Sequence, residues 1–378
     1  MIYLDANATT PLLPEVLEAM LPWLSEGYAN PSGAYAAAKL ARKAIDQARG
    51  QVAELIGADA GEIVFTGGGT ESVNTALHSL HALTGEGTAL ASAIEHSAVL
   101  QCLTTMERQS ELLPVSPGGR VEISTLARAL EHAAFLTLMA ANNETGVIQP
   151  LREAAALARE RGVPVHSDAI QVVGKIPLDV RELGVDLLSL SAHKFHGPKG
   201  VGALFVREGL RFRAFIHGGG QEAGRRSGTE NTAGIVGMGA AAALAKALAP
   251  ALRDAFEKQV LAEISGVTLN GDPAHRLPNT SHLSFTDCDA AGLLILLDEA
   301  GVACSAGSAC MTGKQRPSHV QLAMGISEPL ARSSLRVSFS RLNTPAEALA
   351  AAAALKKAVE KLRRVQGAGV GPVAVYSP

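Results

Sequence analysis

The sequence predicts an α/β protein in which a mostly parallel sheet is flanked by helices and joined to a smaller α+β domain. Short apolar runs alternate with longer helical patterns up to about residue 250, an order typical of parallel strands joined by crossover helices. From about Ala251 the strands and helices are spaced differently. At 378 residues, the chain also exceeds the size at which a single hydrophobic core stops growing.

The strands of the large sheet are predicted from runs rich in Val, Leu, Ile or Phe. These runs are Glu62–Thr66, Ala89–Ala93, Phe135–Ala140, Val163–Asp168, Asp186–Ser191 and Gly202–Val206. Helical patterns cover Ser32–Ile56, closed by Gly57, and Leu151–Arg161, closed by Gly162. Ligands of such sheets bind beyond the carboxyl ends of the strands, so we expect the site at that edge.

The smaller domain is predicted from elements in the last third of the chain. They are strands over Thr280–Phe285, Val302–Cys304 and Leu335–Phe339 and helices over Ala290–Ala300 and Pro345–Arg364. We expect a large domain over 12–250, a small domain built from 1–11 and 251–365, and a tail over 366–378.

Composition and charge indicate an ordinary globular protein that acts on small molecules or other proteins. Hydrophobic residues make up 47% and charged residues 18%, and the net charge of −3 comes from interleaved charges, which argues against nucleic acid or a membrane surface as a partner. The start, Met1 to Thr10, lacks the basic and apolar regions of a secretory signal, so we expect a cytoplasmic protein. The 4 cysteines form no C-x-x-C pair, so no disulfide framework or metal site is indicated.

A glycine-rich segment, Thr66-Gly67-Gly68-Gly69-Thr70-Glu71-Ser72, follows a predicted strand and opens a helical pattern. Glycines such as Gly69 let the backbone approach a ligand, and Thr70 with the helix N-terminus can bind an anion. The segment resembles a phosphate cradle, although it does not match the common nucleotide-binding motifs. A tight turn capped by Thr70 would explain the loop equally well.

A lysine with polar neighbours follows another predicted strand. Lys194 lies in Ser191-Ala192-His193-Lys194, where partial burial could lower the lysine pKa enough for imine formation while Ser191 and His193 hold a phosphate. Taken alone, a surface lysine in a Gly/Pro turn is the better interpretation. Asp168 changes this balance because it ends the preceding strand, where a protonated pyridine nitrogen would find a carboxylate partner.

Together these residues predict a pyridoxal 5'-phosphate site. Gln171, one turn after Asp168, could reach the phenolic oxygen of the cofactor ring, and His96 could stack on the ring. Asn143, after another strand, could bind the ring or the substrate. Each has a structural alternative: a helix cap for Asp168, a capping or solvated side chain for His96, and an Asx turn for Asn143.

The ordered motifs T-G-G-G-T-E-S, E-H, N-N-E-T-G, D-A-I-Q, S-A-H-K, G-R-R-S-G-T-E-N and S-A-G-S-A-C closely resemble those of the cysteine desulfurases. The resemblance runs from Tyr3 to about Thr344. It implies the aspartate aminotransferase-like fold of class V aminotransferases, a homodimer, and an internal aldimine on Lys194. It also implies phosphate contacts from Thr70, Ser191 and His193, and from Thr229 of the other subunit.

The same resemblance assigns the sulfur chemistry. Cys310 would attack the sulfur of a bound L-cysteine and keep it as a persulfide, leaving alanine, and would then pass the sulfur to an acceptor protein, for example in iron–sulfur cluster assembly. Arg336 would bind the substrate carboxylate, although a structural ion pair is its alternative. For Cys304, in a predicted strand, we favour a purely structural role. The segment Lys314–His319 is more basic than is usual in the family.

Two rival functions remain at this stage. A related pyridoxal-phosphate enzyme, such as an aminotransferase or one preferring selenocysteine, would share the fold. Cys310 and Arg336 argue against the aminotransferase but do not exclude selenocysteine. A catalytically inactive scaffold for sulfur-carrier proteins would not need Lys194, Asp168 and Cys310 together.

Overall fold

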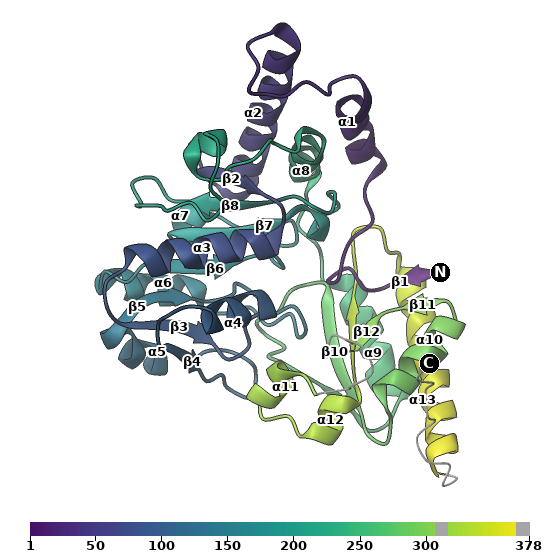
Figure 1. Ribbon diagram of the computed structural model, residues 1–378. Coiled ribbons are helices and arrows are strands. Elements are labelled where there is room, and N and C mark those ends of the chain that lie inside the picture. The colour runs from purple at the N-terminus through teal and green to yellow at the C-terminus, as the bar shows by residue number, and fades with distance from the viewer. Residues whose placement is uncertain (307–316, 368–378) are drawn as a thin grey trace, which may run out of the picture.

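The computed structural model describes residues 1–306 and 317–367, and Figure 1 shows how its helices and strands are arranged. The strands are β1 (Ile2–Tyr3), β2 (Ile63–Thr66), β3 (Thr88–Ser92), β4 (Ser110–Leu113), β5 (Ala133–Thr137), β6 (Val165–Asp168), β7 (Leu187–Ser191), β8 (Gly202–Val206), β9 (Val267–Leu269), β10 (Thr280–Phe285), β11 (Val302–Ala303), β12 (Ser305–Ala306) and β13 (Ser334–Ser338). The α-helices are α1 (Pro14–Ser25), α2 (Ala36–Ile56), α3 (Gly69–Leu83), α4 (Ser97–Thr104), α5 (Ile123–Ala129), α6 (Leu151–Glu160), α7 (Val180–Leu183), α8 (Thr232–Leu244), α9 (Ala251–Glu263), α10 (Ala290–Glu299), α11 (His319–Ala323), α12 (Glu328–Arg332) and α13 (Pro345–Gly367). Short 3₁₀ turns are η1 (Ala60–Glu62), η2 (Leu130–His132), η3 (Ala192–Lys194) and η4 (Gln221–Gly224).

The large sheet has seven strands in the order β2-β8-β7-β6-β5-β3-β4. Strands β7, β6, β5, β3 and β4 run parallel, whereas β8 is antiparallel to both of its neighbours. Side chains alternate between two cores: Ile63 and Phe65 of β2 join the core under α2, α6 and α8, and Val64 joins the core under α3 and α4. Helices therefore cover both faces (Figure 1), and the predicted fold class is confirmed.

The second part of the molecule is an antiparallel sheet, β12-β13-β10-β9, packed with α9, α10 and α13 around its own apolar core. The chain start belongs here, because β1 pairs with β11 and Asp5 bridges to Ser338. It then crosses to the large sheet, where the Thr10 N–H donates to the His193 carbonyl at 2.9 Å. The separate cores support the proposed division into two domains, whose boundaries stay a prediction.

Several predicted elements have different bounds. Helix α2 begins at Ala36 rather than Ser32, because Asn30 closes a turn there: its side-chain oxygen accepts from the Ser32 N–H at 2.9 Å. The predicted strand Val302–Cys304 is two short strands, β11 and β12, with Cys304 between them. Strands β4 and β9 were not predicted, and α13 continues to Gly367, past its predicted end at Arg364. No helix in the described parts of the chain is long and apolar enough to cross a membrane.

Candidate active site

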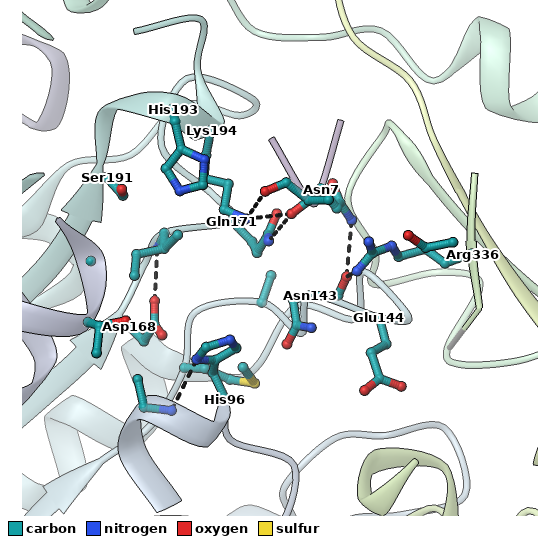
Figure 2. A pocket seen from close by; sticks show the side chains of 18 of the residues that line it. Asn7, His96, Asn143, Glu144, Asp168, Gln171, Ser191, His193, Lys194 and Arg336 are labelled. Atoms are coloured by element: carbon teal, nitrogen blue, oxygen red, sulfur yellow. Dashed lines mark hydrogen bonds between the residues drawn. The ribbon is translucent and has the colours of Figure 1, made fainter. Parts of the chain in front are cut away.

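A cavity of about 620 Å³ lies between the large sheet and the second part of the molecule (Figure 2). One wall is built at the carboxyl ends of the large-sheet strands, and Leu294, Ser305 and Arg336 line the opposite wall. Most residues predicted for the site line this cavity: Gly69, Thr70, His96, Asn143, Asp168, Gln171, Ser191, His193, Lys194 and Arg336. Thr229 is exposed and does not line it, and Cys310 lies outside the described residues.

Lys194 stands in the η3 turn directly after β7, so the strand fixes where its side chain starts. Its Nζ donates to the backbone carbonyls of Asn7 at 2.6 Å and Ala8 at 2.7 Å. Burial, followed by the positive charge of Arg336, lowers the pKa of the Lys194 amine to about 8, against the opposing pull of nearby carboxylates. The side chain therefore lines a cavity, unlike a surface lysine, and its pKa is low enough that a fraction of the amine is neutral at physiological pH.

Asp168 ends β6, the strand beside β7, and its side chain is buried. One carboxylate oxygen accepts from the Ile170 N–H at 3.0 Å, but a turn and not a helix follows, so Asp168 is not a helix cap. The other oxygen has no hydrogen bond to the described residues, and burial raises the pKa of the carboxyl while His96 and Lys194 lower it. A buried carboxyl with one free oxygen suits a protonated ring nitrogen. The positive charge of that nitrogen would favour the ionised form of the Asp168 carboxyl.

His96 caps helix α4 and also lines the cavity. Its Nδ1 accepts from the Ala98 N–H at 3.1 Å, so the neutral ring carries its proton on Nε2. Burial is the main cause that lowers the pKa of His96. The capping interpretation is therefore confirmed, and the cap orients the ring at the cavity, while stacking on a cofactor stays a prediction.

The phosphate end is built where β2 leads into α3. Gly68 has φ 146°, a conformation that favours glycine, and a Cβ added to Gly69 would lie 2.3 Å from Ile170 Cδ1, so the Ile170 side chain would have to move. The hydroxyls of Thr70 and Ser191 have no hydrogen bonds to the described residues and are free to donate to a ligand. Hydroxyl donors beside a helix N-terminus suit a phosphate group.

His193 completes this end of the cavity. Its Nδ1 lies 3.1 Å from Thr9 Oγ1, and burial with the charges of Lys194 and Lys199 lowers its pKa to about 4. The ring is therefore neutral at physiological pH and could bind a phosphate oxygen through an N–H. Taken with Asp168 and Lys194, the residues present fit pyridoxal phosphate.

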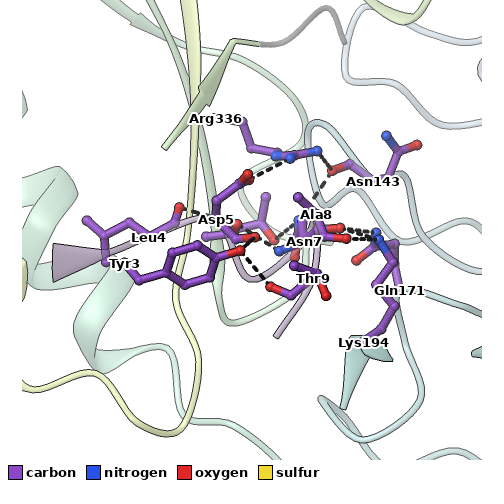
Figure 3. A network of polar contacts seen from close by, with 12 residues as sticks. Tyr3, Leu4, Asp5, Asn7, Ala8, Thr9, Asn143, Gln171, Lys194 and Arg336 are labelled. Carbon is purple, nitrogen blue, oxygen red and sulfur yellow. Dashed lines mark hydrogen bonds and ion pairs between the residues drawn. The ribbon is translucent and has the colours of Figure 1, made fainter. Parts of the chain in front are cut away.

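Arg336 of β13 closes the opposite wall. One guanidinium nitrogen pairs with Asp5 Oδ1 at 2.7 Å and another donates to the Asn143 carbonyl at 3.0 Å, whereas Nε has no partner among the described residues. Figure 3 shows this contact between the chain start, β13 and the Asn143 loop. The structural ion pair therefore exists, and the same guanidinium also lines the cavity.

Asn7 and Glu144 are cavity residues that were not predicted. Glu144 lies inside the N-N-E-T-G motif and Asn7 near the start of the family resemblance, and that position was the available signal. Glu144 Oε2 accepts from the Ser318 hydroxyl at 2.6 Å, and burial raises its pKa to about 7. Cys304 also lines the cavity, but burial raises its thiol pKa to about 12, in agreement with a structural role.

Comparisons with known proteins agree with this geometry. The family model of aminotransferase class-V matches residues 2–350. A protein named cysteine desulfurase from Cereibacter sphaeroides is 44% identical over 383 aligned residues, which cover 98% of this chain and 99% of that one.

Solved structures give the same result. A NifS-like protein superposes with a TM-score of 0.86 at 33% identity, over 97% of this chain and 99% of the other. A structure described as SspA in complex with cysteine gives a TM-score of 0.82 at 36% identity, over 90% of this chain and 99% of the other. With fold, cavity and sequence in agreement over nearly its whole length, the chain belongs to the aminotransferase class-V family and, within it, to the cysteine desulfurases.

Proposed function

We propose that this protein is a pyridoxal-phosphate-dependent cysteine desulfurase that converts L-cysteine to L-alanine and keeps the sulfur as a persulfide on Cys310. The observation that carries the proposal is the cavity that joins Lys194, Asp168 and the Gly69 approach at the ends of three strands. A relative of this fold has been solved with cysteine, which supports the choice of substrate.

The cofactor would supply an electron sink for the substrate carbon when bound. Lys194 offers the amine that takes its aldehyde, Asp168 the partner of its ring nitrogen, and Gln171 a donor to its phenolic oxygen. His96 stacks on the ring. The phosphate contacts come from Gly69, Thr70, Ser191 and His193, with Thr229 from a second subunit of a homodimer.

The protein's own groups then bind the substrate and move its protons. Arg336 and Asn143 would hold the carboxylate and orient the substrate, and the amine of Lys194, with its pKa lowered to about 8, would take the α-proton at Nζ. The Cys310 thiolate forms a bond to the substrate sulfur, the carbon–sulfur bond breaks, and its electron pair stays with the carbon skeleton. Protonation of that carbon completes alanine, so that cysteine and the Cys310 thiol give alanine and a persulfide.

The sulfur acceptor is the remaining partner on this proposal. The persulfide on Cys310 passes to an acceptor or scaffold protein of iron–sulfur cluster assembly or another sulfur-transfer pathway, in the cytoplasm. Interleaved charges with a net value of −3 favour a protein partner over nucleic acid or a membrane surface.

Cys310→Ser tests the proposed sulfur step. The variant should keep the yellow colour of the cofactor but lose release of sulfide from cysteine by about 10⁴-fold or more, the scale seen when a catalytic nucleophile is removed. Alanine and sulfide are measured with a thiol reductant present. Cys304→Ser is the matched control, because a thiol with a pKa of about 12 is not a nucleophile at neutral pH, and it should retain turnover. Full turnover by the Cys310 variant would assign the nucleophile elsewhere.

A further inference from the structure

Lys175 is a buried amine that the proposed mechanism does not use. Its side chain is 3% exposed, and its Nζ donates to Gln171 Oε1 at 2.7 Å and to Asn7 Oδ1 at 2.8 Å. It has no carboxylate partner among the residues that the structure describes. Burial lowers its pKa well below the usual value, and the charges of Lys194 and Arg336 add to this effect. Burial of an amine without a carboxylate partner costs free energy, so we expect Lys175 to have a role at the site that offsets this cost.

The backbone fixes Lys175 beneath the cavity. It lies four residues after Gln171 in the turn that leaves β6, so the two side chains are neighbours on one face of that turn. Its N–H donates to the Val172 carbonyl at 3.0 Å, and its carbonyl accepts from the Leu248 N–H at 2.8 Å. Gly174, at φ 77°, lets the chain pass close to Phe195. The amine therefore has little freedom to move away from Gln171.

The Gln171 amide is held at both of its ends. Oε1 accepts from Lys175, and Nε2 donates to the Asn7 carbonyl at 3.0 Å. Figure 3 shows Gln171 and Lys194 on the same side of Asn7, whose carbonyl accepts from both. These two hydrogen bonds of the Gln171 side chain fix the orientation of the amide group and therefore the direction of the second N–H on Nε2. That N–H has no acceptor within the described part of the chain, and Gln171 lines the cavity (Figure 2).

The Asn7 side chain is also fixed by several hydrogen bonds. Its Oδ1 also accepts from Asn279 Nδ2 at 3.2 Å, and its Nδ2 donates to Thr280 Oγ1 at 2.9 Å. These contacts fix the orientation of the Asn7 amide without help from Lys175. Loss of the lysine amine would therefore release Gln171 more than Asn7, because Gln171 Oε1 has no other donor in the described residues.

We propose that Lys175 is a positioning residue that holds the Gln171 amide with one N–H directed at the phenolic oxygen of the cofactor. It thereby sets the balance between the protonated and unprotonated forms of the bound cofactor. The inference rests on the proposed function, because it requires pyridoxal phosphate in the cavity. A donor at that oxygen stabilises its negative charge, so that loss of the donor makes protonation of the bound cofactor easier.

Spectrophotometric pH titration of the holoenzyme tests this role without relying on turnover. In Lys175→Met and in Gln171→Leu, the pH at which the cofactor absorption changes should rise by about one unit. If Lys175 acts through Gln171, the double variant should shift no further than Gln171→Leu alone. An additive double variant would mean that Lys175 acts independently, through its charge, and would overturn the proposal.

Controls separate this inference from a loss of fold and from the proposed function. Ser167→Ala removes a buried hydroxyl on β6 that donates to the Leu138 carbonyl at 2.7 Å, and its titration should match the unmodified protein. If Lys175→Met does not fold, Lys175→Gln takes its place. The glutamine side chain is one bond shorter than lysine, too short to reach both Gln171 Oε1 and Asn7 Oδ1. If a Lys175 variant binds the cofactor and its titration is unchanged, the proposed role of Lys175 is contradicted, but the proposed function is not. A native protein that binds no pyridoxal phosphate contradicts the proposed function.

Discussion

The two walls of the cavity are built in different ways. On the large-sheet wall, Asp168 and Lys194 follow adjacent parallel strands, so a strand end fixes where each side chain starts. On the opposite wall, Arg336 pairs with Asp5, 331 residues away in the chain, and Ser318, which caps α11, donates to Glu144, 174 residues away. The strand ends are set by the sheet, whereas the position of the Arg336 guanidinium depends on a contact with a distant segment. Under the proposed function, most residues that would hold the cofactor lie on the large-sheet wall, and Arg336, which would bind the substrate, lies on the opposite wall.

Arg336→Ala should produce the largest effect on the second wall. Loss of a charged hydrogen bond to the substrate carboxylate should raise KM for cysteine by about 10- to 100-fold, while the cofactor spectrum stays unchanged. Steady-state kinetics and absorption spectra measure the two effects. Asp5→Asn, which removes the charge but keeps an oxygen that can accept from the guanidinium, is the control and should change KM much less than Arg336→Ala. An unchanged KM in Arg336→Ala would leave this arginine with a structural role.

Ionisation of Glu144 should have a smaller effect, which appears in the pH dependence of the free energy of unfolding. Its folded pKa is about 7 because of burial, above its usual 4.5, so the folded state holds this proton where the unfolded state has lost it. Stability from this group is therefore full below pH 4.5 and is lost as pH rises through 7, by about 3 kcal/mol at most.

Glu144→Gln should remove this part of the slope, measured by urea unfolding between pH 5 and about 8. Ser318→Ala should steepen the slope, because the Ser318 hydroxyl is the hydrogen bond that favours the charged form of Glu144. Equal slopes in all three proteins would show that the Glu144–Ser318 contact does not link the two walls.

The same contrast explains what could be predicted from the sequence. The sheet wall was predictable because an apolar run followed by a polar residue places that residue at a strand end, as for Asp168 and Lys194. Strand β4 was missed because its sequence, Ser-Glu-Leu-Leu, offers an apolar run of only two residues, of which Leu113 alone is buried. Asn7 and Lys175 were also missed. A lysine in Val-Gly-Lys-Ile looks like a surface residue, and its burial depends on segments that meet only in the folded chain.

Reduction of the holoenzyme with borohydride tests the central claim most directly, since it fixes bound pyridoxal phosphate to the amine that holds it. Peptide mass spectrometry should find the label on Lys194, at the end of β7, and not on Lys175, whose amine is held by Gln171 and Asn7. A labelled Lys194 in a yellow protein is the predicted result. A colourless protein, or a label on any other lysine, would contradict the account.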